Sequence, residues 1–145
     1  MPAIRRAQTT DKRSVESLYS IVTGAALSLT DVEWRQFVAQ GGILVAEKEN
    51  QIVGFGGIDL TAKEQLRWLY LRPQFRSSGV GSRILAELEK LAWRSGTQSI
   101  RLHSTPNAVE FYLKHGYTPV PEHEQFGHDH DGLEMIKVRT NCISP

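Results

Sequence analysis

The sequence has little of several features that mark common classes of protein. Among its 145 residues there is one cysteine, Cys142, so no disulfide can form within the chain, and we expect a reducing compartment such as the cytoplasm. No apolar run approaches the roughly 20 residues of a membrane-spanning helix, and no apolar stretch typical of a secretory signal follows the arginines near the N-terminus. We therefore expect one cytoplasmic domain over residues 1–145, with no membrane association.

The sequence also has no large excess of positive or negative charge. The formal net charge is +1, with a charged fraction of 23% and a hydrophobic fraction of 40%. A nucleic-acid-binding protein usually presents a broad positive field, so this balance argues against nucleic acid as a partner. If the chain binds an anion, the site must be local.

Short periodic segments alternate along the chain, with single Gly and Pro residues between them. Helices are predicted to begin after Asp11, after a capping box formed by Thr30 and Glu33, at Gly81 and after Thr105. The order of segments predicts a mixed α/β domain around one sheet. Strand patterns occur at residues 4–7, 43–47, 52–60, 66–71, 99–104, 117–120 and 133–138.

The stretch RSSGVGSRIL, residues 76–85, places an arginine and two glycines directly before a helical stripe. Glycine costs roughly 0.5 to 1 kcal/mol relative to alanine in a regular element, so Gly79 and Gly81 indicate that the backbone comes close to another group. Unpaired N–H groups at a helix start attract anions, and Arg76 adds a positive charge. The segment thus predicts a diphosphate-binding turn, although an ordinary strand-to-helix turn could use the same residues.

Two familiar phosphate-binding motifs are excluded. A P-loop would need lysine and then serine or threonine after its last glycine, whereas Gly81 is followed by Ser82 and Arg83. The dinucleotide-binding fingerprint would need a third glycine where Ile84 stands.

Arg76, Gly79 and Gly81 satisfy the signature Arg/Gln-x-x-Gly-x-Gly/Ala within the longer stretch LYLRPQFRSSGVGSRIL. In this the segment resembles motif A of the GNAT N-acetyltransferase superfamily. The stretch NAVEFYLKHGYTPV, residues 107–120, is similar to the superfamily's Asn-(x)n-Ala/Phe-Tyr-x-x-x-Gly-Phe/Tyr segment. Both motifs occur in the family's order, and the resemblance covers essentially the whole chain, although roughly the first 40 residues match in pattern only.

The resemblance implies a single GNAT-like domain, with about six or seven strands in a mixed, mostly antiparallel sheet and about four flanking helices. It implies an enzyme that transfers an acetyl group from acetyl-CoA to a primary amine by direct attack on the thioester in a ternary complex. The amides of about residues 78–82 would hold the diphosphate, the pantetheine arm would run between strands 66–71 and 99–104, and an amide near Leu69 or Leu71 would polarise the thioester carbonyl. The coenzyme-binding residues implied in this way are Leu69, Leu71, Arg76, Ser77, Ser78, Gly79, Val80, Gly81, Ser82, Asn107 and Tyr112.

Tyr112 matches the superfamily tyrosine that donates a proton to the departing sulfur, although an aromatic residue at helical spacing would also suit the core. The general base is open. Glu64 lies close to where some family members carry a catalytic glutamate, and Asp59, His103 or a chain of water molecules could serve instead.

The loop EHEQFGHDHDG, residues 122–132, gathers three histidines among four acids. Its spacing matches no compact zinc site, so we expect no metal. In the superfamily the equivalent connection often borders the acceptor site, where its acids would favour a cationic amine. Cys142 lies in no motif that would make it a covalent nucleophile.

The acceptor is not readable from the sequence, so a small-molecule amine and a protein amine both stay open, and a homodimer is an expectation drawn from such domains in general. Two other functions stay open as well. One is a noncatalytic acyl-CoA-binding regulatory module, and the other is a nucleotide-binding α/β protein.

Overall fold

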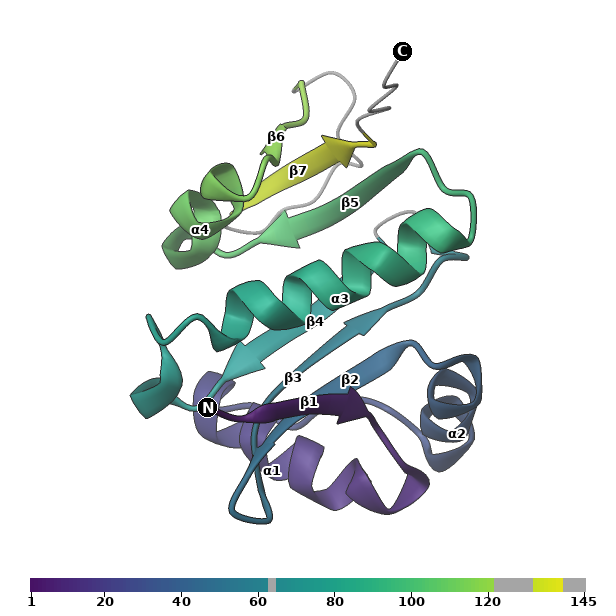
Figure 1. The fold of residues 1–145 in the computed structure, drawn as a ribbon, viewed down its shortest axis with the longest axis vertical. Coiled ribbons are helices and arrows are strands. Elements are labelled where there is room, and N and C mark those ends of the chain that lie inside the picture. The colour runs from purple at the N-terminus through teal and green to yellow at the C-terminus, as the bar shows by residue number, and fades with distance from the viewer. Residues whose placement is uncertain (63–64, 122–131, 140–145) are drawn as a thin grey trace.

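The computed structural model describes residues 1–62, 65–121 and 132–139, and Figure 1 shows their arrangement. No helix in these ranges is both long enough and apolar enough to cross a bilayer. In chain order the elements are β1 (Ala3–Arg6), η1 (Thr9–Asp11), α1 (Lys12–Thr23), α2 (Asp31–Gln40), β2 (Ile43–Lys48), β3 (Gln51–Ile58), β4 (Leu66–Leu71), η2 (Pro73–Phe75), α3 (Val80–Arg94), β5 (Ser99–Ser104), η3 (Pro106–Ala108), α4 (Val109–Lys114), β6 (Thr118–Pro119) and β7 (Leu133–Val138), where η marks a short 3₁₀ helix.

The strands form one seven-stranded sheet in the order β1-β2-β3-β4-β5-β7-β6. Every neighbouring pair is antiparallel except β4 and β5, which are parallel. The predicted mixed, mostly antiparallel sheet with four flanking helices is therefore confirmed. The boundaries differ at a few ends, since the second strand of the hairpin stops at Ile58 rather than at residue 60, and the strand predicted at 117–120 is only Thr118–Pro119.

The sheet is covered on both faces, and each face has its own core. α3 lies across β2, β3 and β4 and buries Ile84, Leu85 and Leu88, each at most 1% exposed (Figure 1). Burying one such side chain contributes about 1.5 to 3 kcal/mol. α1 and α2 cover the other face, where Leu18 and Trp34 pack against residues of β2 and β3.

α3 approaches β3 so closely that the strand has no room for side chains at one point. A Cβ added to Gly56 would lie 2.7 Å from Cγ2 of Ile84 and 2.8 Å from Cδ1 of Leu88. Gly56 therefore has a packing reason, since its missing side chain allows α3 to lie close to the sheet.

The capping box predicted for the second helix is present. The Thr30 N–H donates to Oε1 of Glu33 at 2.9 Å, and the Glu33 N–H donates to Oγ1 of Thr30 at 3.1 Å. These two bonds satisfy donors that a helix start would otherwise leave open, so they define where α2 begins.

Candidate functional site

The parallel pair β4 and β5 is joined at one position only. Leu66 of β4 pairs with Leu102 of β5, and the described strands make no further pair beyond it. Just before this pair, the side-chain oxygen of Gln65 accepts a hydrogen bond from the Arg101 N–H at 2.8 Å. On its other side β5 keeps a full six-residue ladder with β7, so the ladder is interrupted between β4 and β5. We call the unpaired region between residues 69–71 of β4 and residues 103–104 of β5 the β4–β5 opening.

Backbone groups of β4 face this opening. The Arg72 N–H donates to the Val53 oxygen of β3 at 2.9 Å, so the amide of Arg72 points toward β3. Amides in a strand alternate in direction, and the amides of Leu71 and Leu69 therefore point the other way, toward β5. The two amides predicted to contact a carbonyl group thus lie on the side of β4 where no strand partner satisfies them.

The turn before α3 has two residues with positive φ angles, and one of them is a glycine of the predicted diphosphate-binding turn. Ser77 has φ 63° and Gly79 has φ 88°, which bend the chain sharply into the helix. The first intrahelical bond runs from the Arg83 N–H to the Gly79 oxygen at 3.1 Å. Among the described residues no backbone partner uses the amides of Gly79, Val80, Gly81 and Ser82, as expected for a helix start.

Fewer backbone amides are available to a ligand than the predicted range of residues 78–82. The Ser78 N–H donates to the Phe75 oxygen at 3.3 Å, and the Ser78 hydroxyl donates to the same oxygen. The amides open to a ligand therefore begin at Gly79 rather than at Ser78.

The surroundings of these amides differ from residue to residue. Arg76, Ser77 and Ser78 are exposed, whereas Val80 is fully buried and anchors the first turn of α3 in the core. A Cβ on Gly81 would lie 3.3 Å from Cδ1 of Leu71, so the start of α3 packs directly on the end of β4. Asn107 is exposed in η3, which follows β5.

Tyr112 lies on the inner face of α4 and is 8% exposed. Its ring packs edge-on against Phe111 at 5.2 Å and against Tyr117 at 5.6 Å between ring centroids. Burial, and to a smaller extent the nearby Tyr70 hydroxyl, raise the pKa of Tyr112 above its ordinary range. The hydroxyl makes no hydrogen bond to a described residue, so it is a protonated donor that is still open to a ligand.

Tyr70 and Tyr19 form a further aromatic pair, which was not predicted from the sequence. Their rings meet edge-on at 5.1 Å, on the face of the sheet opposite α3, and Phe55 lies 5.7 Å from Tyr70. Burial raises the pKa of Tyr70, with Tyr19 adding to the shift. The available signal was the alternation in β4, where Tyr70 stands between Leu69 and Leu71.

The candidate bases are in very different positions. Glu64 lies outside the described residues. The Asp59 carboxylate accepts hydrogen bonds from the Thr61 N–H at 3.0 Å and the Thr61 hydroxyl at 2.7 Å, and Arg67 lies 3.8 Å from it, so Asp59 is held in a turn. His103 is half-buried on β5, one residue beyond the last pair with β4, and it stands opposite Glu134 of β7. Of these groups, His103 stands beside the β4–β5 opening.

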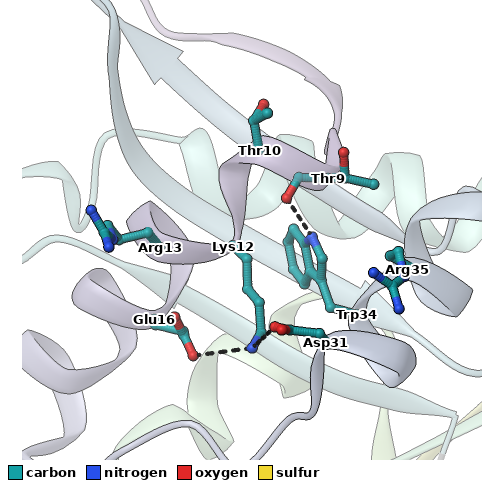
Figure 2. A pocket seen from close by; sticks show the side chains of 8 residues that line it. All are labelled: Thr9, Thr10, Lys12, Arg13, Glu16, Asp31, Trp34 and Arg35. Atoms are coloured by element: carbon teal, nitrogen blue, oxygen red, sulfur yellow. Dashed lines mark hydrogen bonds and ion pairs between the residues drawn. The ribbon is translucent and has the colours of Figure 1, made fainter.

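A hollow of about 320 Å³ lies at the beginnings of α1 and α2, and Figure 2 shows its walls. Lys12 joins the two helices, with Nζ 2.7 Å from Asp31 and 3.5 Å from Glu16, and the Trp34 ring nitrogen donates to the Thr9 oxygen at 3.0 Å. No residue of β4, β5 or α3 lines this hollow, so it is separate from the β4–β5 opening. The hollow is lined by Thr9, Thr10, Lys12, Arg13, Glu16, Asp31, Trp34 and Arg35.

The polar loop at 122–131, which was expected to border the acceptor site, lies outside the described residues.

Comparison with known proteins gives one family. The model of the acetyltransferase (GNAT) domain matches residues 19–139. The uncharacterized N-acetyltransferase YjcF of Bacillus subtilis (strain 168) is 40% identical over 62 residues, which is 43% of this chain and 44% of that protein.

Solved structures share the fold at low identity. The PaiA N-acetyltransferase of Thermoplasma acidophilum, in complex with coenzyme A, is 18% identical with a TM-score of 0.75, and the match covers 96% of this chain and 99% of that one. Rv2747 of Mycobacterium tuberculosis, also with CoA, is 19% identical with a TM-score of 0.76 over 96% and 100% of the two chains. The N-acetylglutamate synthase of Neisseria gonorrhoeae, with coenzyme A and N-acetyl-glutamate, is 18% identical with a TM-score of 0.76, over 95% of this chain and 35% of that one.

Proposed function

Because this chain belongs to the GNAT acetyltransferase family, we propose that it transfers the acetyl group of acetyl-CoA to a primary amine by direct attack of the amine on the thioester. The family resemblance first drawn from two sequence motifs is confirmed by the match over residues 19–139. The observation that carries the proposal is the missing strand pairing between β4 and β5 after Leu66, together with the open amides at the start of α3, which packs on Leu71 at the end of β4. Coenzyme A in solved structures of the same fold supports acetyl-CoA as the donor.

In this proposal the coenzyme diphosphate binds the amides of residues 79–82. The positive end of the α3 dipole and the open N–H groups favour an anion there, and the exposed Arg76 adds a positive charge. Ser77 and Ser78 line the same turn, with the Ser78 hydroxyl bonded to Phe75. Asn107, exposed in η3 after β5, would be a further contact with the coenzyme.

The pantetheine arm would occupy the β4–β5 opening as a partial substitute for the missing strand pairs. The thioester carbonyl would then accept a hydrogen bond from the amide of Leu69 or Leu71, both of which point into the opening. Such a donor stabilises the negative charge that develops on oxygen when the amine attacks, and this is worth several kcal/mol in comparable sites, about 2.7 to 4 for one donor.

Tyr112 is the proposed acid. Its raised pKa keeps the phenol protonated at neutral pH, so its hydrogen is available when the C–S bond breaks and the thiolate of CoA leaves. The proton that the amine loses passes to a base, for which Glu64 is our first proposal and His103 or water the alternatives. Asp59 is the weakest of the candidates because Thr61 and Arg67 already engage its carboxylate.

The acceptor enters the proposal only as an amine, either of a small molecule or of a protein. A cytoplasmic location, inferred from the single cysteine, and a homodimer are further parts of the proposal.

The test is release of free thiol from acetyl-CoA in the presence of a panel of amines. Turnover with at least one amine supports the proposal, and mass spectrometry should find the acetyl group on nitrogen. A protein that binds acetyl-CoA but turns over none of the amines would fit the noncatalytic acyl-CoA-binding module instead. A nucleotide-binding protein would be stabilised against heat by ATP or NAD and not by acetyl-CoA.

A further inference from the structure

His115, at the end of α4, joins this helix to the first turn of α3. Its Nδ1 lies 2.7 Å from the backbone oxygen of Phe111, and its Nε2 lies 2.9 Å from Oγ of Ser82. The imidazole also lies over the Phe111 ring, with the two centroids 4.4 Å apart. Three contacts therefore fix the imidazole beside Ser82, one of the residues whose amides are open.

The contact with Phe111 decides which nitrogen carries the hydrogen. A carbonyl oxygen only accepts hydrogen bonds, so Nδ1 of His115 must be the protonated nitrogen. In the neutral imidazole Nε2 is then an acceptor, and the Ser82 hydroxyl donates its one hydrogen to it. In this state Ser82 Oγ has only lone pairs left for a ligand.

A phosphate group also offers only acceptor oxygens, so the neutral pair is poorly matched to the diphosphate proposed to bind here. If Nε2 gains a proton, it becomes a donor to Ser82 Oγ, and the hydroxyl hydrogen is free to turn toward the phosphate. The change adds one proton to Nε2 and breaks no covalent bond. It also places a positive charge on the imidazole, which is separated from the proposed phosphate by the Ser82 side chain.

The groups in contact with His115 are uncharged, so a proton taken up in this contact would be held by the imidazole. His115 makes no ion pair with any described residue. Its neighbours in the packing are Ser82 of α3 and Phe111 of α4, which are uncharged. The adjacent cations in the sequence are Lys114, which precedes His115, and Arg83, which follows Ser82 and donates a hydrogen bond to the Pro2 oxygen at 2.9 Å.

We infer that His115 is a positioning residue for the coenzyme, which takes up a proton as the diphosphate binds and so turns the Ser82 hydroxyl into a phosphate donor. The inference rests on the proposed coenzyme site. Its consequence is that the affinity for the coenzyme rises as the pH falls.

The experiment is calorimetric titration with dephospho-CoA, which keeps the diphosphate but lacks the 3′-phosphate, a group that itself titrates near neutral pH. Titration in two buffers of different ionisation enthalpy gives the number of protons taken up on binding. We expect proton uptake by the wild-type protein, and roughly tenfold tighter binding at about pH 5.5 than at about pH 8.5, the size of one charge-assisted hydrogen bond.

Two variants separate a proton-linked role from a structural one. In His115→Gln the side-chain amide can donate to Ser82 at every pH, so binding should persist while the proton uptake and most of the pH dependence disappear. Ser82→Ala should weaken binding about tenfold at low pH and little at high pH, and its effect should not add to that of His115→Gln in the double variant.

Equal proton uptake by wild type and His115→Gln would overturn the inference while leaving the coenzyme site intact. A wild-type affinity that does not change with pH would overturn it without any variant. If neither CoA nor dephospho-CoA binds the wild-type protein, the proposed function itself fails, and the inference fails with it.

Discussion

Replacing Tyr112 with phenylalanine removes one hydroxyl from a buried ring and leaves its contacts with Phe111 and Tyr117 in place. Because that hydroxyl bonds to no described residue, we expect the free energy of unfolding to change by no more than about 0.5 kcal/mol. If the hydroxyl protonates the departing thiolate, kcat should fall by about 10²- to 10⁴-fold, with little change in the affinity for acetyl-CoA. At about 1.4 kcal/mol per factor of ten, this is a barrier increase of about 3 to 5 kcal/mol.

Tyr117 is the matched control. Its ring touches that of Tyr112, but its hydroxyl donates to Oε2 of Glu89 at 2.9 Å, and Lys137 lies 3.1 Å from the other oxygen of the same carboxylate. A hydrogen bond to a charged group contributes about 1.5 to 3 kcal/mol, so Tyr117→Phe should lower the free energy of unfolding by about that amount. Its kcat should stay within about twofold of the wild-type value, since the hydroxyl already donates its hydrogen to Glu89 of α3.

The assays are thiol release from acetyl-CoA with a competent amine, and urea unfolding of both variants. We expect Tyr112→Phe to lose turnover but not stability, and Tyr117→Phe to lose stability but not turnover. If Tyr112→Phe keeps the wild-type kcat, the proposed role of Tyr112 as the general acid is refuted. Loss of activity in both variants in proportion to their loss of stability would show that the tyrosines act through packing.

Three further outcomes are expected. Gly56→Ala should lower the free energy of unfolding by about 1 to 3 kcal/mol in urea unfolding, because its new methyl group would press on Ile84, and an unchanged midpoint would contradict the packing of α3 on β3. Arg76→Ala should weaken CoA binding about three- to tenfold at low salt and much less at high salt in calorimetric titrations, whereas a salt-independent loss would argue against a charge effect. The hydrogen bond from Arg5, with a backbone bond from Gln8, holds the pKa of Asp11 below its ordinary value against the opposing effect of burial, so the stability that Asp11 contributes is present at neutral pH and is lost as the pH falls below about 4. Unfolding of wild type and Asp11→Asn at several pH values should therefore differ most at neutral pH, and a difference that grows in acid would reverse the assignment.

Much of the fold was predictable because the local signals agree with the tertiary structure. The capping box of Thr30 and Glu33 and the apolar stripe of α3 need only neighbouring residues, and both are present as predicted. The errors are at ends that depend on distant partners. The strand predicted at 117–120 is short because it pairs with β7 at two residues only, Thr118 with Ile136 and Pro119 with Met135.

The candidate site divides in the same way. The start of α3 after the glycine-containing turn was predictable because a helix start depends on neighbouring residues, whereas the positive φ angle of Ser77 was not predicted. The contact of His115 with Ser82 joins residues 33 positions apart, and the pair of Tyr19 and Tyr70 joins α1 to β4. The spacing of residues in the sequence does not predict such contacts, since they form only when the helices pack on the sheet.

The account depends on the amides at the start of α3 binding the coenzyme diphosphate. The most direct measurement is the backbone amide NMR spectrum of the protein during titration with CoA. We predict that the resonances of Gly79, Val80, Gly81 and Ser82 shift together and saturate with one affinity, while that of Ser78, whose N–H is already bonded to Phe75, shifts less. Saturable CoA binding that leaves these four resonances in place, or no binding at all, would contradict the account.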